Sequence, residues 1–250
     1  MVYFKAFIAA LQFLTRLPFH WVRLEADDFG KGLAYFPMVG LIIGALTGIS
    51  YEYLLFLPHE VAAAIILLLH VILTGGLHWD GLMDTIDGIF SARERDKILE
   101  IMKDSRVGAH GVTGAVMLFL LKFTLLLALP EVIENFSMVI ILASISMLAR
   151  WSMAIAILAF PYAKKQGLGT FFREKANRAQ LIFASLSTII IVYLSLSLTS
   201  ILLIISALVF MYLFSISMTR MLGGMTGDTY GALCELEEII LLTTAVVIFA

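Results

Sequence analysis

The chain has 250 residues, of which 61% are hydrophobic and 14% are charged, and its mean hydropathy is +0.98. Water-soluble domains carry about 25% charged residues, so this apolar excess requires lipid around much of the surface. The net charge of −2 provides no basic surface for a nucleic acid, and the single cysteine, Cys234, excludes an intramolecular disulfide.

The predicted elements are helices throughout. The first, Tyr3–Leu17, is expected to lie at the membrane interface. A bilayer crossing needs about 20 mostly apolar residues. The apolar runs that follow, in chain order, are Leu33–Leu57, Val61–Leu77, Gly111–Leu129, Met138–Phe160, Leu181–Leu198, Ile201–Met218 and a shorter run from about Ile239 to Ala250. The sequence therefore predicts an all-α, polytopic transmembrane bundle of about seven spans plus the interfacial helix, forming a single domain over residues 1–250.

Lysine and arginine predict the orientation of this bundle. They occur in the N-terminal segment, at 78–110 and at 161–180, and Arg220 marks the segment 219–236. The alternate loops, at 58–60, 130–137 and 199–200, carry none. Because basic residues accumulate in cytoplasmic loops, we expect the N-terminus and the basic segments in the cytoplasm and the C-terminus outside.

The segment Gly75–Gly88 contains the strongest chemical signal. Asp80, Asp84 and Asp87 are spaced i, i+4 and i+7, which places the three carboxylates within about 60° of one helix face. Their mutual repulsion and desolvation favour a divalent cation such as Mg²⁺ that also carries substrate phosphates. A solvated acidic face is the alternative, but the flanking residues are apolar. Gly76 could serve either phosphate approach or helix packing.

A second segment, Ile101–Gly111, precedes the third span. Lys103 and Arg106 can bind phosphate oxygens, and His110 begins a helix whose free backbone N–H groups favour an anion. The alternative is that these basic residues only set the topology.

A third segment, 220–232, is rich in glycine and lies between apolar runs. Non-helical backbone at a membrane is tolerated where it lines a cavity or is buried in protein. Asp228 is thus a candidate fourth carboxylate, near Gly224 and Thr226. The alternative is an ordinary turn.

Some ionisable residues fall within or beside the spans. Arg150 and Lys122 are expected to pair with carboxylates rather than to catalyse. Glu235 is either a further ligand or the start of the last helix, and His70 is interpreted as structural.

The motifs resemble one known family. Gly75–Gly88 (GGLHWDGLMDTIDG), Met102–Gly111 (MKDSRVGAHG) and Gly223–Ala232 (GGMTGDTYGA), with Phe13–Pro18 and Tyr35–Gly40, are similar to the cobalamin synthase family, the adenosylcobinamide-GDP ribazoletransferases. The resemblance implies that a ribose hydroxyl of α-ribazole, or of its 5′-phosphate, attacks the cobinamide-linked phosphate of adenosylcobinamide-GDP and that GMP leaves. It also implies a Mg²⁺ cofactor and a multi-pass protein of the inner membrane; a homo-oligomer is possible.

Phosphoryl-transfer logic assigns expected roles to the marked residues. Asp80 and Asp84 would hold the metal, Asp87 or Asp228 would complete its site, and one of these two would take the hydroxyl proton. His78 is a second candidate base, although it should point away from the aspartates. The residues expected to bind substrate are Lys103, Arg106, His110, Gly76, Gly224, Thr226 and Arg150.

Two alternatives remain open from the residues themselves. A CDP-alcohol phosphotransferase also places aspartates at a membrane face, although its usual spacing matches imperfectly after Asp87–Gly88. An ion-coupled transporter would also use intramembrane carboxylates and broken helices, but no internal repeat is visible here.

Overall fold

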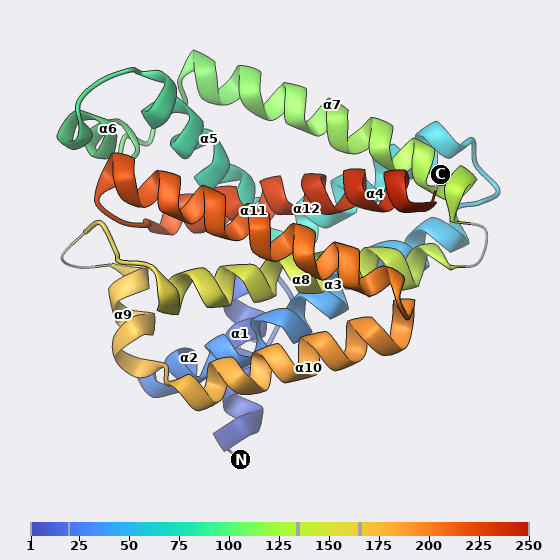
Figure 1. Ribbon diagram of the computed structural model, residues 1–250, viewed down its shortest axis with the longest axis horizontal. Coiled ribbons are helices and arrows are strands. Elements are labelled where there is room, and N and C mark those ends of the chain that lie inside the picture. Colours follow the sequence, from blue (N-terminus) through green and yellow to red (C-terminus); the bar gives the residue numbers. More distant parts are fainter. Residues whose placement is uncertain (1, 20, 134–135, 165–166, 250) are drawn as a thin grey trace.

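A computed structural model of the chain describes residues 2–19, 21–133, 136–164 and 167–249, and the fold is all-α (Figure 1). The elements are α1 (Val2–Leu14), α2 (Ala26–Gly32), the 3-10 helix η1 (Leu33–Tyr35), α3 (Phe36–Tyr53), α4 (His59–Thr74), α5 (Leu77–Phe90), α6 (Arg95–Ile101), α7 (Ala109–Val132), α8 (Met138–Ala159), α9 (Leu168–Lys175), α10 (Arg178–Leu196), α11 (Thr199–Leu222) and α12 (Gly227–Phe249). The predicted fold class is confirmed.

The span count is lower than the sequence predicted. In the described part of the chain, five helices are long and apolar enough to cross a membrane, or six if the bent pair α4–α5 is one span. The expected break at Ser197–Ser200 is confirmed, because Ser197 has a φ of +52° between α10 and α11. The expected seventh span, from about Ile239, is instead the second half of α12, which begins at Gly227 and carries four acidic residues in its first twelve positions.

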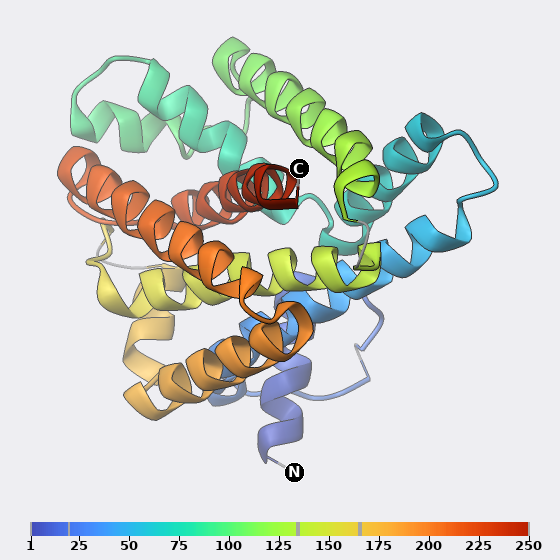
Figure 2. The ribbon, with the colours of Figure 1, turned by 45° about the vertical axis from the view of Figure 1, so that its right-hand side comes forward.

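Helix α8 lies at the centre of the bundle, and it is the most completely buried of the candidate spans (Figures 1 and 2). Gly40, Gly44 and Gly48 of α3 face it, and a Cβ atom on any of them would overlap backbone atoms of α8. Small residues spaced by four allow two helix backbones to approach closely, as in other membrane proteins. By contrast, α7, α10 and α11 bury few of their apolar side chains inside the protein, as lipid-facing helices do.

The connections between helices alternate between the two ends of the bundle. The segments between α5 and α7 and between α11 and α12 lie at one end, on the left in Figure 1. The turns between α3 and α4 and between α10 and α11, with the end of α12, lie at the other. The basic segments at 78–110 and 219–236 thus share one end, in agreement with the predicted alternation.

A sharp bend between α4 and α5 directs the acidic helix α5 toward the end of the bundle that carries the basic segments. Helices α4 and α5 meet at an angle of 91°. The bend consists of Gly75 and Gly76, whose φ values of +64° and +70° fall in the left-handed region that residues with a Cβ rarely adopt. Gly76 therefore has a structural role in directing α5.

Candidate active site

Helix α5 presents the predicted aspartates on one face. Because residues 77–90 are helical, Asp80, Asp84 and Asp87 follow one another along a stripe of that face. Asp80 is exposed, and the other two are partly buried. The carboxylates of Asp80, Asp228 and Asp87 lie near enough to Asp84 to repel its negative charge. These four residues are here called the aspartate site, and the predicted fourth carboxylate does lie among them.

The α11–α12 connection places Asp228 in this site. The backbone N–H of Met225 donates to the carbonyl of Pro161 at 2.8 Å, and the N–H of Ala163 donates to the carbonyl of Met225 at 2.8 Å. Gly224 has a φ of +155°, and a Cβ there would lie 2.6 Å from the Pro161 oxygen. Glycine is therefore required for this pairing of two loops.

The same pairing brings a lysine to the aspartates. Residue 164 follows directly after the paired segment, and Lys164 Nζ lies 3.5 Å from Asp228 Oδ2. In the described part of the chain, Lys164 is the one basic side chain in ion-pair contact with the aspartate site. From the sequence, Lys164 indicates only the topology, because the loop contact that positions it is non-local.

Thr226 caps helix α12. Its backbone N–H donates to Thr229 Oγ1 at 2.7 Å, and Thr226 Oγ1 accepts from the Thr229 N–H at 3.2 Å. The same hydroxyl donates to Asp228 Oδ2 at 3.3 Å. Thr226 is fully buried, so the structure assigns it to holding Asp228 in the first turn.

Close packing of α5 on α12 keeps the aspartates together. A Cβ added to Gly81 would lie 2.7 Å from the Asp228 carbonyl oxygen, and one added to Gly231 would lie 3.1 Å from the His78 oxygen. Glycine on each helix therefore allows the two backbones to touch beside the carboxylates.

Asp87 also connects two helices, which its i, i+4, i+7 spacing with Asp80 and Asp84 did not predict. Its Oδ2 accepts the backbone N–H of Gly108 at 2.7 Å, and its Oδ1 accepts that of Gly111 at 2.8 Å. These N–H groups belong to the start of α7, where backbone donors lack helical partners and favour a negative charge. Asp87 thus fastens α7 to α5.

The predicted phosphate-binding residues lie in the α6–α7 region. Lys103 and His110 are exposed. Arg106 is engaged with Asp104, through Nη2–Oδ2 at 2.7 Å and Nε–Oδ1 at 3.0 Å. This guanidinium holds the pKa of Asp104 at about 2, so the pair stays ionised at neutral pH. Arg106, predicted to bind phosphate, thus already has a carboxylate partner.

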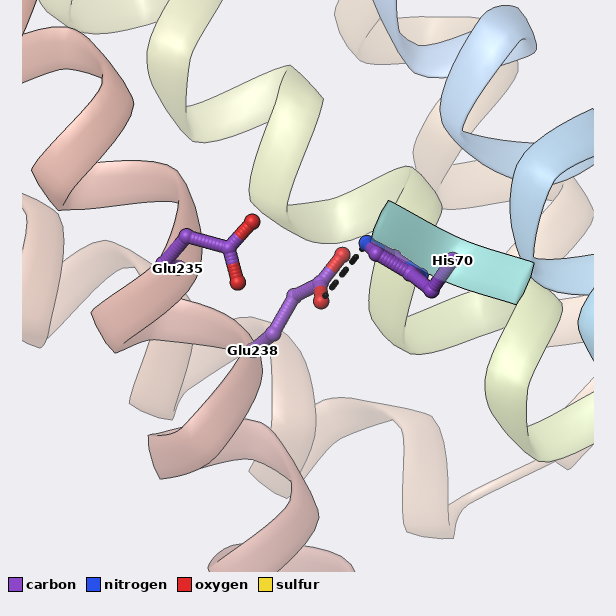
Figure 3. A group of neighbouring side chains, drawn as sticks. All are labelled: His70, Glu235 and Glu238. Carbon is purple, nitrogen blue, oxygen red and sulfur yellow. Dashed lines mark ion pairs between the residues drawn. The ribbon is translucent and has the colours of Figure 1, made fainter. Parts of the chain in front are cut away.

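A second charged group is buried inside the bundle. Lys122 Nζ of α7 lies 3.0 Å from Glu235 Oε2 and 2.5 Å from Glu238 Oε2. Arg150 of α8 also binds Glu238, and His70 Nε2 lies 3.5 Å from Glu238 Oε2 (Figure 3). These five residues are here called the ion cluster. The pairing expected for Lys122 and Arg150 is confirmed.

The ion cluster has the spacing of a metal site but not the charge of one. The side chains of His70, Glu235 and Glu238 point toward one another (Figure 3). Their ligand atoms lie within 4.8 Å of one another, so these three could hold a metal ion. Lys122 and Arg150 already supply two positive charges to the same carboxylates. An added divalent cation would meet strong repulsion in this interior of low dielectric constant.

Arg150 and His78 belong with this interior group. Arg150 is wholly buried, and its Nη2 lies 3.4 Å from His78 Nδ1. As expected, His78 points away from the aspartate stripe, toward α8. The role of Glu238 was missed, although three glutamates within four residues, in a chain with two intramembrane cations, were a usable signal.

The aspartate site fits a hard divalent cation by its chemistry. All four groups offer carboxylate oxygens, and no described side chain donates a hydrogen bond or ion pair to Asp80 or Asp84. Among the described residues, no three of these carboxylates bring ligand atoms within 4.8 Å of one another. Asp80 and Asp84 thus lie next to each other without side-chain partners, and the four carboxylates do not form a closed cage. This suits Mg²⁺, which keeps several waters and shares phosphate oxygens.

Comparisons with known proteins agree with the motif resemblance. Residues 6–246 match the family model described as cobalamin-5-phosphate synthase. An adenosylcobinamide-GDP ribazoletransferase of Desulfitobacterium hafniense is 40% identical over 94% of both chains. That of Alkaliphilus metalliredigens is 40% identical over 93% of this chain and 91% of its own, and that of Escherichia coli K12 is 35% identical over 95% and 98%. No solved structure matches the chain. The chain therefore belongs to the cobalamin-5-phosphate synthase family, the transferases that act in cobalamin biosynthesis.

Proposed function

We propose that this membrane enzyme joins adenosylcobinamide-GDP to α-ribazole, or to its 5′-phosphate, at the aspartate site. A ribose hydroxyl oxygen forms the new bond to the phosphorus attached to cobinamide, the bond from that phosphorus to the GMP oxygen breaks, and the hydroxyl proton passes to a protein base. The products are adenosylcobalamin, or its 5′-phosphate, and GMP. The ribazoletransferase activity for which the relatives are named supports this reaction.

One observation carries the proposal. Asp80 and Asp84 lie one helical turn apart beside Asp228, and among the described residues the ion pair of the nearby Lys164 is with Asp228. Negative charge left without a partner is costly beside a membrane interior, and the divalent cation that accompanies a diphosphate would supply the missing positive charge. We assign Asp80, Asp84 and Asp228 as the residues that would hold Mg²⁺, with Asp87 at the edge of the set. The ion supplies charge neutralisation on the phosphate oxygens.

The hydrogen-bond partners of Asp87, His78 and Asp228 indicate which of these candidate bases could take the hydroxyl proton. Both oxygens of Asp87 accept backbone N–H groups, and hydrogen bonds to a carboxylate make it a weaker base. His78 is buried against Arg150 on the far side of α5. Asp228 also receives contacts, from Thr226 and Lys164, but both reach Oδ2, and no described group donates to Oδ1. Asp228, partly exposed at the start of α12, is therefore our candidate to take the hydroxyl proton.

Basic residues beside the site would receive the leaving GMP. Lys164 already contacts Asp228, and Lys103 is exposed in the segment that Asp87 fastens to α5. Lysine ammonium groups bind phosphate as point charges. We place this end of the bundle in the cytoplasm, because the basic loops gather there and both substrates are cytoplasmic.

The test is turnover by the purified protein. Detergent-solubilised protein with adenosylcobinamide-GDP, α-ribazole phosphate and Mg²⁺ should release GMP and form a corrinoid with the spectrum of the product. Chelation should stop the reaction, and added Mg²⁺ should restore it and raise the melting temperature, since a ligand that binds only the folded state stabilises it. No GMP from the complete mixture would refute the function. Full activity in chelator would refute only the metal assignment.

A further inference from the structure

The two ring nitrogens of His78 differ in their contacts. The residue is only 2% exposed. Nδ1 of His78 lies 3.4 Å from Nη2 of Arg150, whereas Nε2 of His78 has no hydrogen-bond partner in the part of the chain that the structure describes. A polar atom that is buried without a partner destabilises the folded protein. Its presence therefore points to a ligand that supplies the partner.

Arg150 decides which nitrogen of His78 carries the hydrogen. A guanidinium group contains only donors, so Nδ1 of His78 must accept the bond from Arg150. Arg150 is held in place through Nη1, which binds Glu238 and donates to Ser146 Oγ at 2.7 Å. An imidazole that accepts at Nδ1 carries its hydrogen on Nε2. Nε2 is therefore an N–H donor, and in this state it has no lone pair with which to take a proton.

His78 also lines a cavity beside the aspartate site. The cavity has a volume of about 130 Å³, and its polar lining residues are His78, Asp80, Asp228 and Tyr230. Although the imidazole points away from the aspartate stripe, the cavity extends from Asp80 to His78 along the first turn of α5. Its volume exceeds the ~30 Å³ of one water in the liquid but is below the ~150 Å³ of a cavity that holds benzene. A single phosphoryl group is the part of the substrates that matches this size.

The rest of the cavity wall is apolar. Phe13, Phe36 and Phe172 line it, and their ring centroids lie 5.3 to 5.8 Å apart. Such a wall keeps water away, and a hydrogen bond is stronger where the local dielectric constant is low. A donor that is already in position when charge develops needs no rearrangement during the reaction. Arg150 and the phenylalanines thus hold His78 as a preorganised donor.

We infer that His78 donates a hydrogen bond from Nε2 to a non-bridging oxygen of the phosphorus under attack, and that it does not act as the base. Negative charge is spread over these oxygens in the transition state of phosphoryl transfer. Asp80 and Asp228, the residues assigned to the divalent cation, line the same cavity, so the phosphate would meet the cation and the His78 donor together. The inference rests on the proposed function, because that function supplies the phosphate.

Two amide substitutions separate the roles of the ring nitrogens. A glutamine amide reaches about as far as Nε2 of histidine, and an asparagine amide about as far as Nδ1. His78→Asn keeps an acceptor for Arg150 but leaves no donor in the cavity, so kcat should fall about 100-fold, the scale for loss of one preorganised donor. His78→Gln restores a donor and should keep kcat within about tenfold of wild type. The KM for α-ribazole phosphate should change less than about twofold in both.

His59→Asn is the matched control. His59 begins α4, and its Nδ1 lies 3.0 Å from the hydroxyl of Tyr51, outside the cavity. This change should leave turnover per folded molecule unchanged. Melting temperatures in detergent give the folded fraction of every variant, so that a loss of kcat is not confused with a loss of fold.

The pH profile of kcat distinguishes a donor from a base without the asparagine variant. His78→Gln should keep the wild-type profile, because a donor that stays neutral does not titrate during the reaction. If folded His78→Gln and His78→Asn lost turnover equally, if both kept it, or if His78→Gln lost the acid limb of the profile, the inference would be overturned while wild-type turnover still supports the function. A wild-type enzyme that releases no GMP would instead refute the function itself.

Discussion

The aspartate site and the ion cluster differ in how their negative charge is balanced, although both contain side chains of α12. In the ion cluster, Glu238 contacts Lys122 and Arg150, and its side chain is only 3% exposed. In the aspartate site, Asp80 and Asp84 receive no ion pair from a described side chain, and Asp80 is open to solvent. A carboxylate whose charge is neutralised inside the protein has little capacity left for a ligand, whereas one without a partner retains it.

This difference in charge pairing indicates a structural role for the glutamates of the ion cluster and a chemical role for the aspartates. Buried pairs in a membrane bundle join helices, and the cluster joins α4, α7, α8 and α12. Removing one partner leaves an uncompensated charge in the interior. Asp80 and Asp84 have the opposite character, because no described side chain pairs with them, and in the proposed reaction a divalent cation would balance their charge. The comparison therefore predicts that the two sites respond differently to the same change from carboxylate to amide.

The largest effect on turnover is expected at Asp84. Asp84→Asn should lower kcat by about 100-fold or more, the scale seen when one preorganised electrostatic group is removed. The melting temperature should not fall, because the change relieves repulsion from Asp80 and Asp228. GMP release and thermal unfolding in detergent measure the two quantities. The control is Asp96→Asn on α6, whose side chain is 94% exposed. Near-normal turnover in Asp84→Asn would contradict the metal assignment.

The next effect concerns stability at Glu238. Glu238→Gln should lower the free energy of unfolding by about 3 kcal/mol, because Arg150 and Lys122 lose a buried charge partner. Turnover per folded molecule should fall less than tenfold. Denaturation in detergent, with activity normalised to folded protein, measures both.

Glu237→Gln is the matched control for this change. Glu237 is on the same helix and equally buried, but its contact in the described structure is the hydroxyl of Ser152 rather than a cation. Its substitution should cost much less stability. If Glu238→Gln abolished turnover without loss of stability, the distinction between the two sites would be wrong.

The smallest effect is expected at Lys164, where the two loops meet. Lys164→Met should reduce kcat/KM for adenosylcobinamide-GDP about tenfold, corresponding to one charge-assisted hydrogen bond of roughly 1.4 kcal/mol. Lys175→Met provides the comparison, because Lys175 pairs with Asp27 at 2.7 Å on the surface. Equal kcat/KM values for both variants would contradict a role of Lys164 in binding adenosylcobinamide-GDP.

Local patterns in the sequence were enough to predict several features. Apolar run length identified most of the membrane helices, and the split at Ser197–Ser200 followed from the length of a crossing. The i, i+4, i+7 spacing of Asp80, Asp84 and Asp87 predicted their common face. These features depend on helical periodicity and on the thickness of a bilayer, which are the same in every bundle.

Only the tertiary structure decided which charges meet. The rotation and depth of α7, α8 and α12 bring Lys122 and Arg150 to Glu238, and loop pairing across Met225 brings Lys164 to Asp228. The start of the predicted seventh span was wrong for the same reason. The cations that make buried glutamates tolerable in the first half of α12 come from other helices. The sequence determined each helix and its faces, but partners distant in sequence are chosen by how those faces pack.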